Sequence, residues 1–186
     1  MIITIVGSGG VEGLEDALVG VDVVMACNVA CVLVKADIVI VVESAAARKY
    51  RDEMKTAVRA GAQLHAEPRA ASQFLGGSAG RQRKADNQWK VHTRLDMRYE
   101  HGATGYVKGR PVYGTCGAVA IQHAVDLGAT EVRMVGFLGY RDDRFATSLQ
   151  EKILAFCAAD CPHVEFVVWG ETLYELPVSD NFKHIT

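Results

Sequence analysis

Three glycine-containing turns in this sequence could bring a ligand close to the backbone. Gly7-Ser8-Gly9-Gly10 directly follows an apolar run, Thr115-Cys116-Gly117 precedes a segment with helical spacing, and Gly136 begins a stretch that reaches Tyr140. Glycine lets the main chain approach a phosphate or a sugar, and successive backbone N–H groups in a turn attract anions. The spacing therefore favours a phosphate- or sugar-binding loop over a plain tight turn.

The first turn does not match the dinucleotide-binding pattern. That pattern has glycines at its first, third and sixth positions, whereas the sixth position here is Glu12 and Gly13 comes one place late. Asn28 also stands where a carboxylate would hold the ribose of NAD. No Gly-Lys-Ser/Thr follows the turn, which excludes a Walker-type loop.

Polar residues at the ends of the next two apolar runs have two interpretations each. Asn28 can hold a phosphate oxygen or a base edge through its amide, or it can cap a helix. Glu43 and Ser44 can meet a ribose, a metal or an acceptor, or they can form a solvated strand end that caps the next helix. The residue types alone leave both alternatives open.

The five cysteines favour buried thiols over catalysis or metal binding. Cys116, near a helix start, could be a nucleophile with a lowered pKa, but no histidine or acid is tied to it by the sequence. Cys27 with Cys31, and Cys157 with Cys161, lie in apolar runs at a spacing that is not a standard zinc motif. We therefore expect reduced, inert thiols and no metal site.

The histidines are scattered, and two of them are candidates for a general base. His92 and His101 flank a segment of changed composition, whereas His123 falls opposite the apolar stripe of its helix and is expected to be exposed. Arg81, Arg83, Lys84 and Arg110 could close over a phosphate or simply form a solvated charged surface. Glu43 is the third weak candidate for a catalytic role.

The segments that carry these residues are expected to alternate between strand and helix. Continuous apolar, β-branched runs predict parallel strands at 2–6, 22–27, 37–42, 131–135 and 164–169, with a further strand at 63–66. Helices are expected at 11–19, 45–59 and 145–159 and after Thr115, with Gly128 ending the last of these, and 170–186 is expected to form a short helix and a tail. The pattern indicates a single α/β domain over 1–186, a Rossmann-like three-layer sandwich with a mostly parallel sheet. A flexible insertion is expected at about 67–109, and 89–97 and 104–108 within it could form short strands.

Composition narrows the class of protein. A net charge of −2 gives no reason to expect a nucleic-acid partner, and no apolar run is long enough to span a membrane. The N-terminus lacks the basic leader and cleavage site of a signal peptide, and the odd cysteine count suits a reducing compartment. We expect a cytoplasmic protein with a small-molecule ligand, with oligomerisation left open.

The glycine loop, Asn28 and the unit from 113 to 140 together resemble a known family. The chain is similar to the bacterial lipooligosaccharide sialyltransferases and the related archaeal 6-hydroxymethyl-dihydropterin diphosphokinase-like proteins over about two-thirds of its length. The matching positions are Gly7, Gly9, Asn28, Thr115-Cys116-Gly117, Leu127-Gly128, Gly136 and Tyr140. The chain departs from the family where Pro-Ser-Leu is replaced by Gly10-Val11-Glu12, a serine by Cys116 and an aspartate by Leu138.

The resemblance implies a nucleotide-binding transferase that uses a nucleotide-sugar donor. It implies nucleotide binding by Gly7, Ser8 and Gly9, phosphate contacts from Asn28 and Tyr140, and donor contacts from Thr115 to Gly117, with Gly136 at the same edge. The family's catalytic histidine has no counterpart after Tyr140, as would fit a shortened, divergent or phage-borne member. Two alternatives remain: an ATP-dependent diphosphokinase-like enzyme that uses a divalent metal held by Glu43 with Asp142 or Asp143, and a non-catalytic nucleotide-binding or assembly module.

Overall fold

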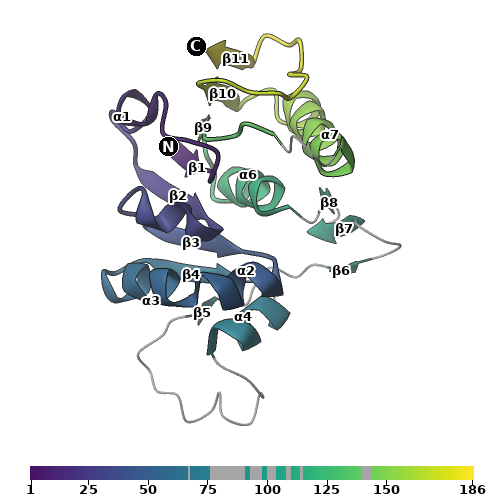
Figure 1. Cartoon of the computed structure of the whole chain (residues 1–186). Helices are drawn as coiled ribbons and strands as arrows, with labels where there is room; N and C mark the ends of the chain where they lie inside the picture. Colours follow the sequence, from purple (N-terminus) through teal and green to yellow (C-terminus); the bar gives the residue numbers. More distant parts are fainter. Residues whose placement is uncertain are drawn as a thin grey trace.

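The structure is a computed structural model that describes residues 1–66, 68–75, 91–92, 98–99, 104–107, 110–113, 115–139 and 144–186. Within these residues, eight strands form one sheet in the order β11-β10-β9-β1-β2-β3-β4-β5, and every neighbouring pair is parallel (Figure 1). The strands are β1 (Ile2–Val6), β2 (Val23–Cys27), β3 (Ile38–Val41), β4 (Gln63–Ala66), β5 (Val91–His92), β9 (Glu131–Val135), β10 (Glu165–Trp169) and β11 (Phe182–Ile185). The Rossmann-like α/β fold predicted from the apolar runs is confirmed.

Helices cover both faces of the sheet because the central strands are apolar on both sides. Ile3 and Ile5 pack in one core with α6 (Cys116–Asp126) and α7 (Arg144–Asp160). Val6 and Val24 pack in a second core, on the opposite face, to which α1, η1 and α2 to α4 contribute. These elements are α1 (Leu14–Ala17), the 3₁₀ helix η1 (Asn28–Val32), α2 (Ser44–Lys49), α3 (Arg51–Arg59) and α4 (Pro68–Leu75). Side chains alternate between the faces of a strand, so one short apolar run serves both cores.

A smaller antiparallel sheet leads into the central unit. It consists of β6 (Arg98–Tyr99), β7 (Thr104–Val107) and β8 (Arg110–Tyr113) in the order β6-β7-β8. Within the predicted insertion, β5 and β7 fall in the two stretches expected to form short strands, and Arg81, Arg83 and Lys84 lie outside the described residues. None of the described helices combines the length and the apolar composition that crossing a membrane requires.

The predicted turn, helix and strand of the central unit are confirmed. The Thr115 hydroxyl accepts the Ala118 N–H at 3.1 Å and caps α6. The helix ends at a left-handed Gly128 with φ +87°, after which β9 begins. An oxygen at the N-cap and a glycine after the last turn satisfy backbone groups that the helix leaves without partners.

Two expectations about the other elements are wrong. The helix expected at 45–59 is two helices, because Tyr50 leaves helical geometry with φ −108° and ψ 29°. The short helix and tail expected at 170–186 are instead a loop followed by β11, which pairs with β10. The strand is largely exposed, so it lacks the apolar run that marks the central strands, and it is held by Asn181, whose Nδ2 lies 3.1 Å from the carbonyl oxygens of Ala158, Cys161 and Val164.

We expect Gly136→Ala to destabilise the protein far more than Gly128→Ala. Both glycines have positive φ, so each alanine costs about 1 kcal/mol of backbone strain. A Cβ at Gly136 would also lie 2.7 Å from the Gly7 carbonyl oxygen and 2.8 Å from that of Gly10, whereas a Cβ at Gly128 meets nothing within 4 Å. Urea denaturation should therefore show a further loss of about 2 kcal/mol or more in the free energy of unfolding for Gly136→Ala. Equal losses in the two variants would contradict this close backbone contact.

Candidate functional site

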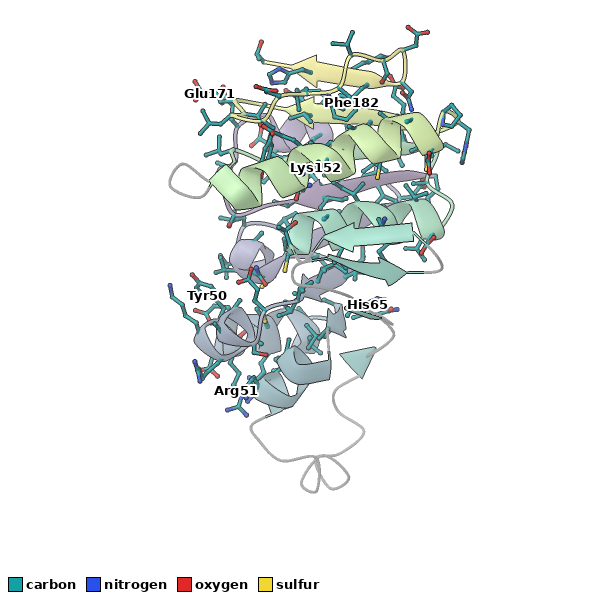
Figure 2. The ribbon with its side chains drawn as sticks, turned by 90° about the vertical axis from the view of Figure 1, so that its right-hand side faces the viewer. Tyr50, Arg51, His65, Lys152, Glu171 and Phe182 are labelled. Atoms are coloured by element: carbon teal, nitrogen blue, oxygen red, sulfur yellow. The ribbon has the colours of Figure 1, made fainter. Side chains whose placement is uncertain are left out.

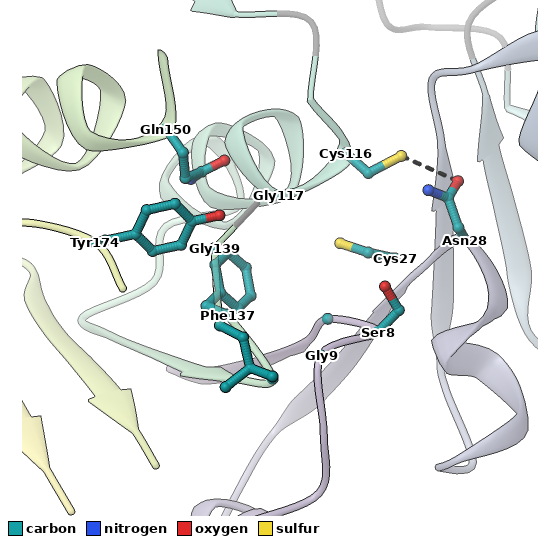
Figure 3. Close-up of a pocket in the computed structure, with 13 residues that line it drawn as sticks. Ser8, Gly9, Cys27, Asn28, Cys116, Gly117, Phe137, Gly139, Gln150 and Tyr174 are labelled. Atoms are coloured by element: carbon teal, nitrogen blue, oxygen red, sulfur yellow. Dashed lines mark hydrogen bonds between the residues drawn. The ribbon is translucent and has the colours of Figure 1, made fainter. Parts of the chain in front are cut away.

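A cleft opens at the carboxyl ends of β1 and β9, where the order of the strands reverses. The chain continues from β1 to β2 on one side of the sheet, whereas β9 and β10 lie on the other side. Open α/β sheets bind ligands at this kind of switch point. The cleft has a volume of about 190 Å³, and its lining is Gly7, Ser8, Gly9, Cys27, Asn28, Cys116, Gly117, Gly136, Phe137, Leu138, Gly139, Gln150 and Tyr174 (Figure 3).

The turn after β1 is bonded to the turn after β9. The Gly7 N–H donates to the Val135 carbonyl at 2.7 Å, and the Gly9 N–H donates to the Gly136 carbonyl at 3.0 Å. Ser8, between the two glycines, is exposed. The glycine loop is thus fixed at both glycines and presents the serine hydroxyl to solvent and ligand.

Asn28 adopts a conformation that is rare for a residue with a side chain. Its φ is +52°, and no other non-glycine residue in the described chain has a positive φ. Its Oδ1 accepts the Cys116 S–H at 3.1 Å, and Figure 3 shows the amide nitrogen on the side of the cleft. Asn28 is the first residue of η1 and Cys27 is its N-cap, so Asn28 does not cap this helix. A strained residue held by a specific bond at a cleft is typical of a functional position.

The start of α6 is held by a buried pair of polar side chains. The Thr115 hydroxyl donates to Gln150 Oε1 at 2.7 Å while it accepts the Ala118 N–H. Gln150 is 1% exposed, and in the described part of the chain its Nε2 has no hydrogen-bond partner. A buried donor without a partner is costly, so this nitrogen is a group that a ligand in the cleft could satisfy.

The thiols beside the cleft are neutral. Burial raises the pKa of Cys116 to about 12 from its usual 9.0, and the Val42 N–H, which donates to Sγ at 3.3 Å, opposes this only in part. Burial also raises the pKa of Cys27 well above its usual value, with a smaller contribution from Cys116. All five cysteines are free and buried, as predicted. A nucleophilic cysteine needs the thiolate, so Cys116 is suited to hydrogen bonding and not to attack.

The structure brings most of the predicted binding residues together. Those in the cleft lining are Gly7, Ser8, Gly9, Asn28, Cys116, Gly117 and Gly136. Thr115 is buried behind them, and Glu43 is exposed and outside the lining. His92 lies on β5, separated from β2 by β3 and β4, while Tyr140, His101, Asp142 and Asp143 lie outside the described residues.

Sequence reasoning missed several lining residues. Phe137 and Leu138 follow a strand end, and so does the loop that carries Tyr174, so the rule that sites lie past strand ends could have found them. Gly139, within the stretch to Tyr140 that the sequence indicated, also lines the cleft. Gln150 gives no such signal, because it lies within α7 and reaches the cleft only through the packing of that helix beside Thr115. Cys27 ends a buried strand, so its sequence context indicates a core residue and not a residue of the cleft.

Comparison with known proteins identifies no relative of this chain, so function is inferred from the geometry of the cleft. No protein-family model matches the chain, no curated protein matches its sequence, and no solved structure matches its fold.

The stability of the protein should fall steeply above pH 9, in part because of Cys116. Its thiol ionises near pH 9.0 in the unfolded chain but near pH 12 when folded, so alkaline pH favours the unfolded state within this window and has no such effect below it. Cys116→Ser keeps a donor and an acceptor but does not ionise there. Between about pH 8 and pH 10.5, urea unfolding should show the wild type losing about 2 kcal/mol more than this variant. Parallel losses would show that Cys116 ionises freely in the folded protein.

Proposed function

We propose that the cleft binds the phosphate-bearing part of a nucleotide and that the protein is a transferase that uses a nucleotide-sugar donor. The observation that carries the proposal is the convergence, at the switch point of the sheet, of the glycine loop, the Asn28 amide and the N-terminus of α6. The Asn28 amide and the start of α6 offer N–H donors, and the glycine loop offers the Ser8 hydroxyl, and such donors are what an anionic ligand requires.

The start of α6 is the strongest candidate for the phosphate position. The helix has 11 residues, and its N-terminus carries a partial positive charge from the aligned peptide dipoles. Thr115 occupies the Ala118 N–H, and the neighbouring residues Cys116 and Gly117 line the cleft. The buried Nε2 of Gln150 is an independent sign that a polar ligand belongs at this position.

The size and the walls of the cleft suit part of a nucleotide. Its volume of about 190 Å³ is below the roughly 300 Å³ at which sites for whole small ligands begin. A diphosphate would be enclosed, while the base and the sugar would lie at the rim. Leu138 and Tyr174 offer apolar and aromatic surface there, and Figure 3 shows the Tyr174 hydroxyl on the cleft side.

Sugar transfer from a nucleotide requires stabilisation of the departing phosphate more than it requires a nucleophile on the protein. Fixed N–H donors and a helix N-terminus aimed at the developing charge supply that stabilisation. The neutral Cys116 thiol would then serve as a small spacer whose S–H holds Asn28 in place. The resemblance to the sialyltransferases supports the same class of donor.

A second candidate is a non-catalytic nucleotide-binding module. One observation favours it: among the described lining residues there is no Asp, Glu, His, Lys or Arg, and hence no conventional general base. The diphosphokinase-like alternative has less support, because Glu43 lies outside the cleft lining.

A thermal-shift and calorimetric screen of CMP, UDP, GDP, ADP and ATP conjugates, with and without Mg²⁺, separates the candidates. Binding with turnover supports the transferase, binding alone the module, and no binding to any of them contradicts both.

Asn28→Gly should weaken binding of the nucleotide that this screen identifies by about 5- to 30-fold, as expected for the loss of one or two hydrogen bonds worth about 1–2 kcal/mol. Glycine tolerates the φ of +52°, so the variant removes the amide without adding backbone strain. Asn28→Asp keeps the acceptor for the Cys116 S–H but replaces the donor by a negative charge, and it should bind more weakly still. Calorimetry that shows unchanged affinity in both variants would reject the phosphate contact.

Cys116→Ser should retain nucleotide binding and any transferase activity, whereas Cys116→Leu should abolish binding. Serine preserves the size and the hydrogen bonds to Asn28 and Val42, but a leucine side chain would fill the cleft and displace Asn28. Affinity and activity are measured beside the unfolding free energy of each variant. A substrate adduct on Cys116 in intact-mass spectra, or an inactive but folded Cys116→Ser, would instead identify a thiol enzyme.

A further inference from the structure

A second cavity lies beside the cleft, at the same edge of the sheet. Its volume is about 310 Å³, and its lining is Leu138, Glu171, Thr172, Leu173, His184 and Thr186. These residues lie at or just past the carboxyl ends of β9, β10 and β11, which are parallel neighbours, so the two cavities follow one edge of the sheet. Figure 2 shows Glu171 and Phe182 at the β11 end of the sheet, away from His65 on β4.

The cleft and the second cavity share a wall. Leu138 lines both of them. The loop after β10 is fixed against this wall, because the Leu173 N–H donates to the Leu138 carbonyl at 2.8 Å. The Thr172 hydroxyl also donates to the Phe137 carbonyl at 2.7 Å. Tyr174 on the same loop lines the cleft, while Thr172 and Leu173 line the second cavity. The rim of the cleft at Leu138 is therefore also the rim of the second cavity.

His184 is held in the second cavity by one of its ring nitrogens. Its Nε2 lies 2.8 Å from the Gly170 carbonyl oxygen, which only accepts, so Nε2–H is the donor and the lone pair of the neutral ring is on Nδ1. Among the described residues, Nδ1 has no hydrogen-bond partner. The Gly170 N–H donates to the Ile185 carbonyl at 2.8 Å, which fixes β11 beside the ring. A histidine whose second nitrogen is oriented by another group is the arrangement of a general base.

His184 lies on the face of the sheet that carries the start of α6. Side chains two residues apart on a strand share a face, and Phe182 packs against the core to which α6 and α7 contribute. The cleft is lined from the same two helices by Cys116, Gly117 and Gln150. His123 differs from His184 in this respect, because it contacts His65 on β4 and lines neither cavity. That contact leaves His123 half-buried and not exposed as its helical pattern predicted.

The two cavities offer opposite chemistry to a ligand. The cleft presents donors, whereas the second cavity presents two acceptors, the Glu171 carboxylate and His184 Nδ1. A carboxylate repels a phosphate, so the phosphates of a nucleotide belong in the cleft and not in the second cavity. Leu138 is half-buried and Leu173 is 56% exposed, and both add apolar surface. Acceptors beside apolar surface suit a neutral molecule that carries hydroxyl groups, such as a sugar.

We propose that the second cavity binds the acceptor of the transfer reaction, a hydroxyl-bearing sugar, and that His184 is the general base that activates it. The proposal rests on the function proposed for the cleft, and it supplies the base that the described lining of the cleft lacks. Nδ1 takes the proton of the acceptor hydroxyl while the hydroxyl oxygen attacks the anomeric carbon of the donor. The bond from that carbon to the phosphate oxygen breaks, and the nucleotide leaves with the electron pair, stabilised by the donors of the cleft.

The first test measures nucleotide release from the CMP-, UDP- or GDP-sugar that binds the cleft, with glucose, galactose, N-acetylglucosamine or lactose as the acceptor. At least one of these sugars should accelerate release by the wild type. His184→Gln can still donate to the Gly170 carbonyl, so it should bind the donor with unchanged affinity in calorimetry but release nucleotide at least about 100-fold more slowly. His163→Gln is the matched control, because His163 is exposed in the turn between α7 and β10.

The second test separates binding of the acceptor from the proton transfer. Glu171→Gln removes a charged acceptor but leaves His184 in place, so it should raise the KM of the sugar about 10-fold or more with little change in kcat. Urea unfolding of each variant shows whether a lost activity reflects a lost fold.

The possible failures are distinguishable. A wild type that binds none of the nucleotide-sugars overturns the function proposed for the cleft and this proposal with it. A wild type that binds a donor but is not accelerated by any of the sugars overturns the acceptor site alone. Unchanged release by folded His184→Gln overturns the role of the base, and an unchanged KM in Glu171→Gln overturns the acceptor contact of that carboxylate.

Discussion

The backbone contact between the turns after β1 and β9 is the constraint on which the cleft depends. The Gly7 and Gly9 N–H groups donate to the carbonyls of Val135 and Gly136, and a Cβ on either glycine would lie 2.6 or 2.5 Å from the Gly136 oxygen. Only glycines allow the two main chains to approach this closely. Because β1 and β9 are the neighbours at which the strand order reverses, this junction forms the floor of the cleft. The other walls are positioned relative to it.

A neutral thiol links three of those walls. Cys116 at the start of α6 accepts the N–H of Val42, just past β3, and donates its S–H to Asn28, just past β2. Burial keeps the thiol protonated, so it acts as a donor and an acceptor at once and carries no charge. The described lining of the cleft thus offers hydroxyl and N–H groups and a helix N-terminus to a ligand, without a charged side chain. Such donors are already oriented before a ligand arrives, which is what stabilisation of a departing phosphate requires.

Helix α6 connects the cleft to the other end of the fold. Its N-terminus lies at the cleft, while His123 in its second half meets His65 on β4. The Thr115–Gln150 bond fixes the first end of the helix against α7.

The central strands and the glycine turns follow from the local sequence alone. Val, Ile and Ala runs such as Ile2–Val6 are apolar on both sides, which is compatible only with a strand covered on both faces, and Thr115 and Gly128 mark the ends of α6 by local backbone chemistry. The same local logic placed Gly7, Asn28 and Gly136 at strand ends, and hence at one edge of the sheet.

Contacts between segments that are distant in the chain depend on the way the fold is assembled. Gln150 reaches the cleft because α7 packs beside Thr115, and His123 meets His65 because β4 joins the sheet next to β3. β11 forms because β10 offers it an edge, although its own residues are largely exposed. Hydrophobic periodicity records which residues are buried but not which partner buries them, so these juxtapositions depend on how the whole sheet is assembled.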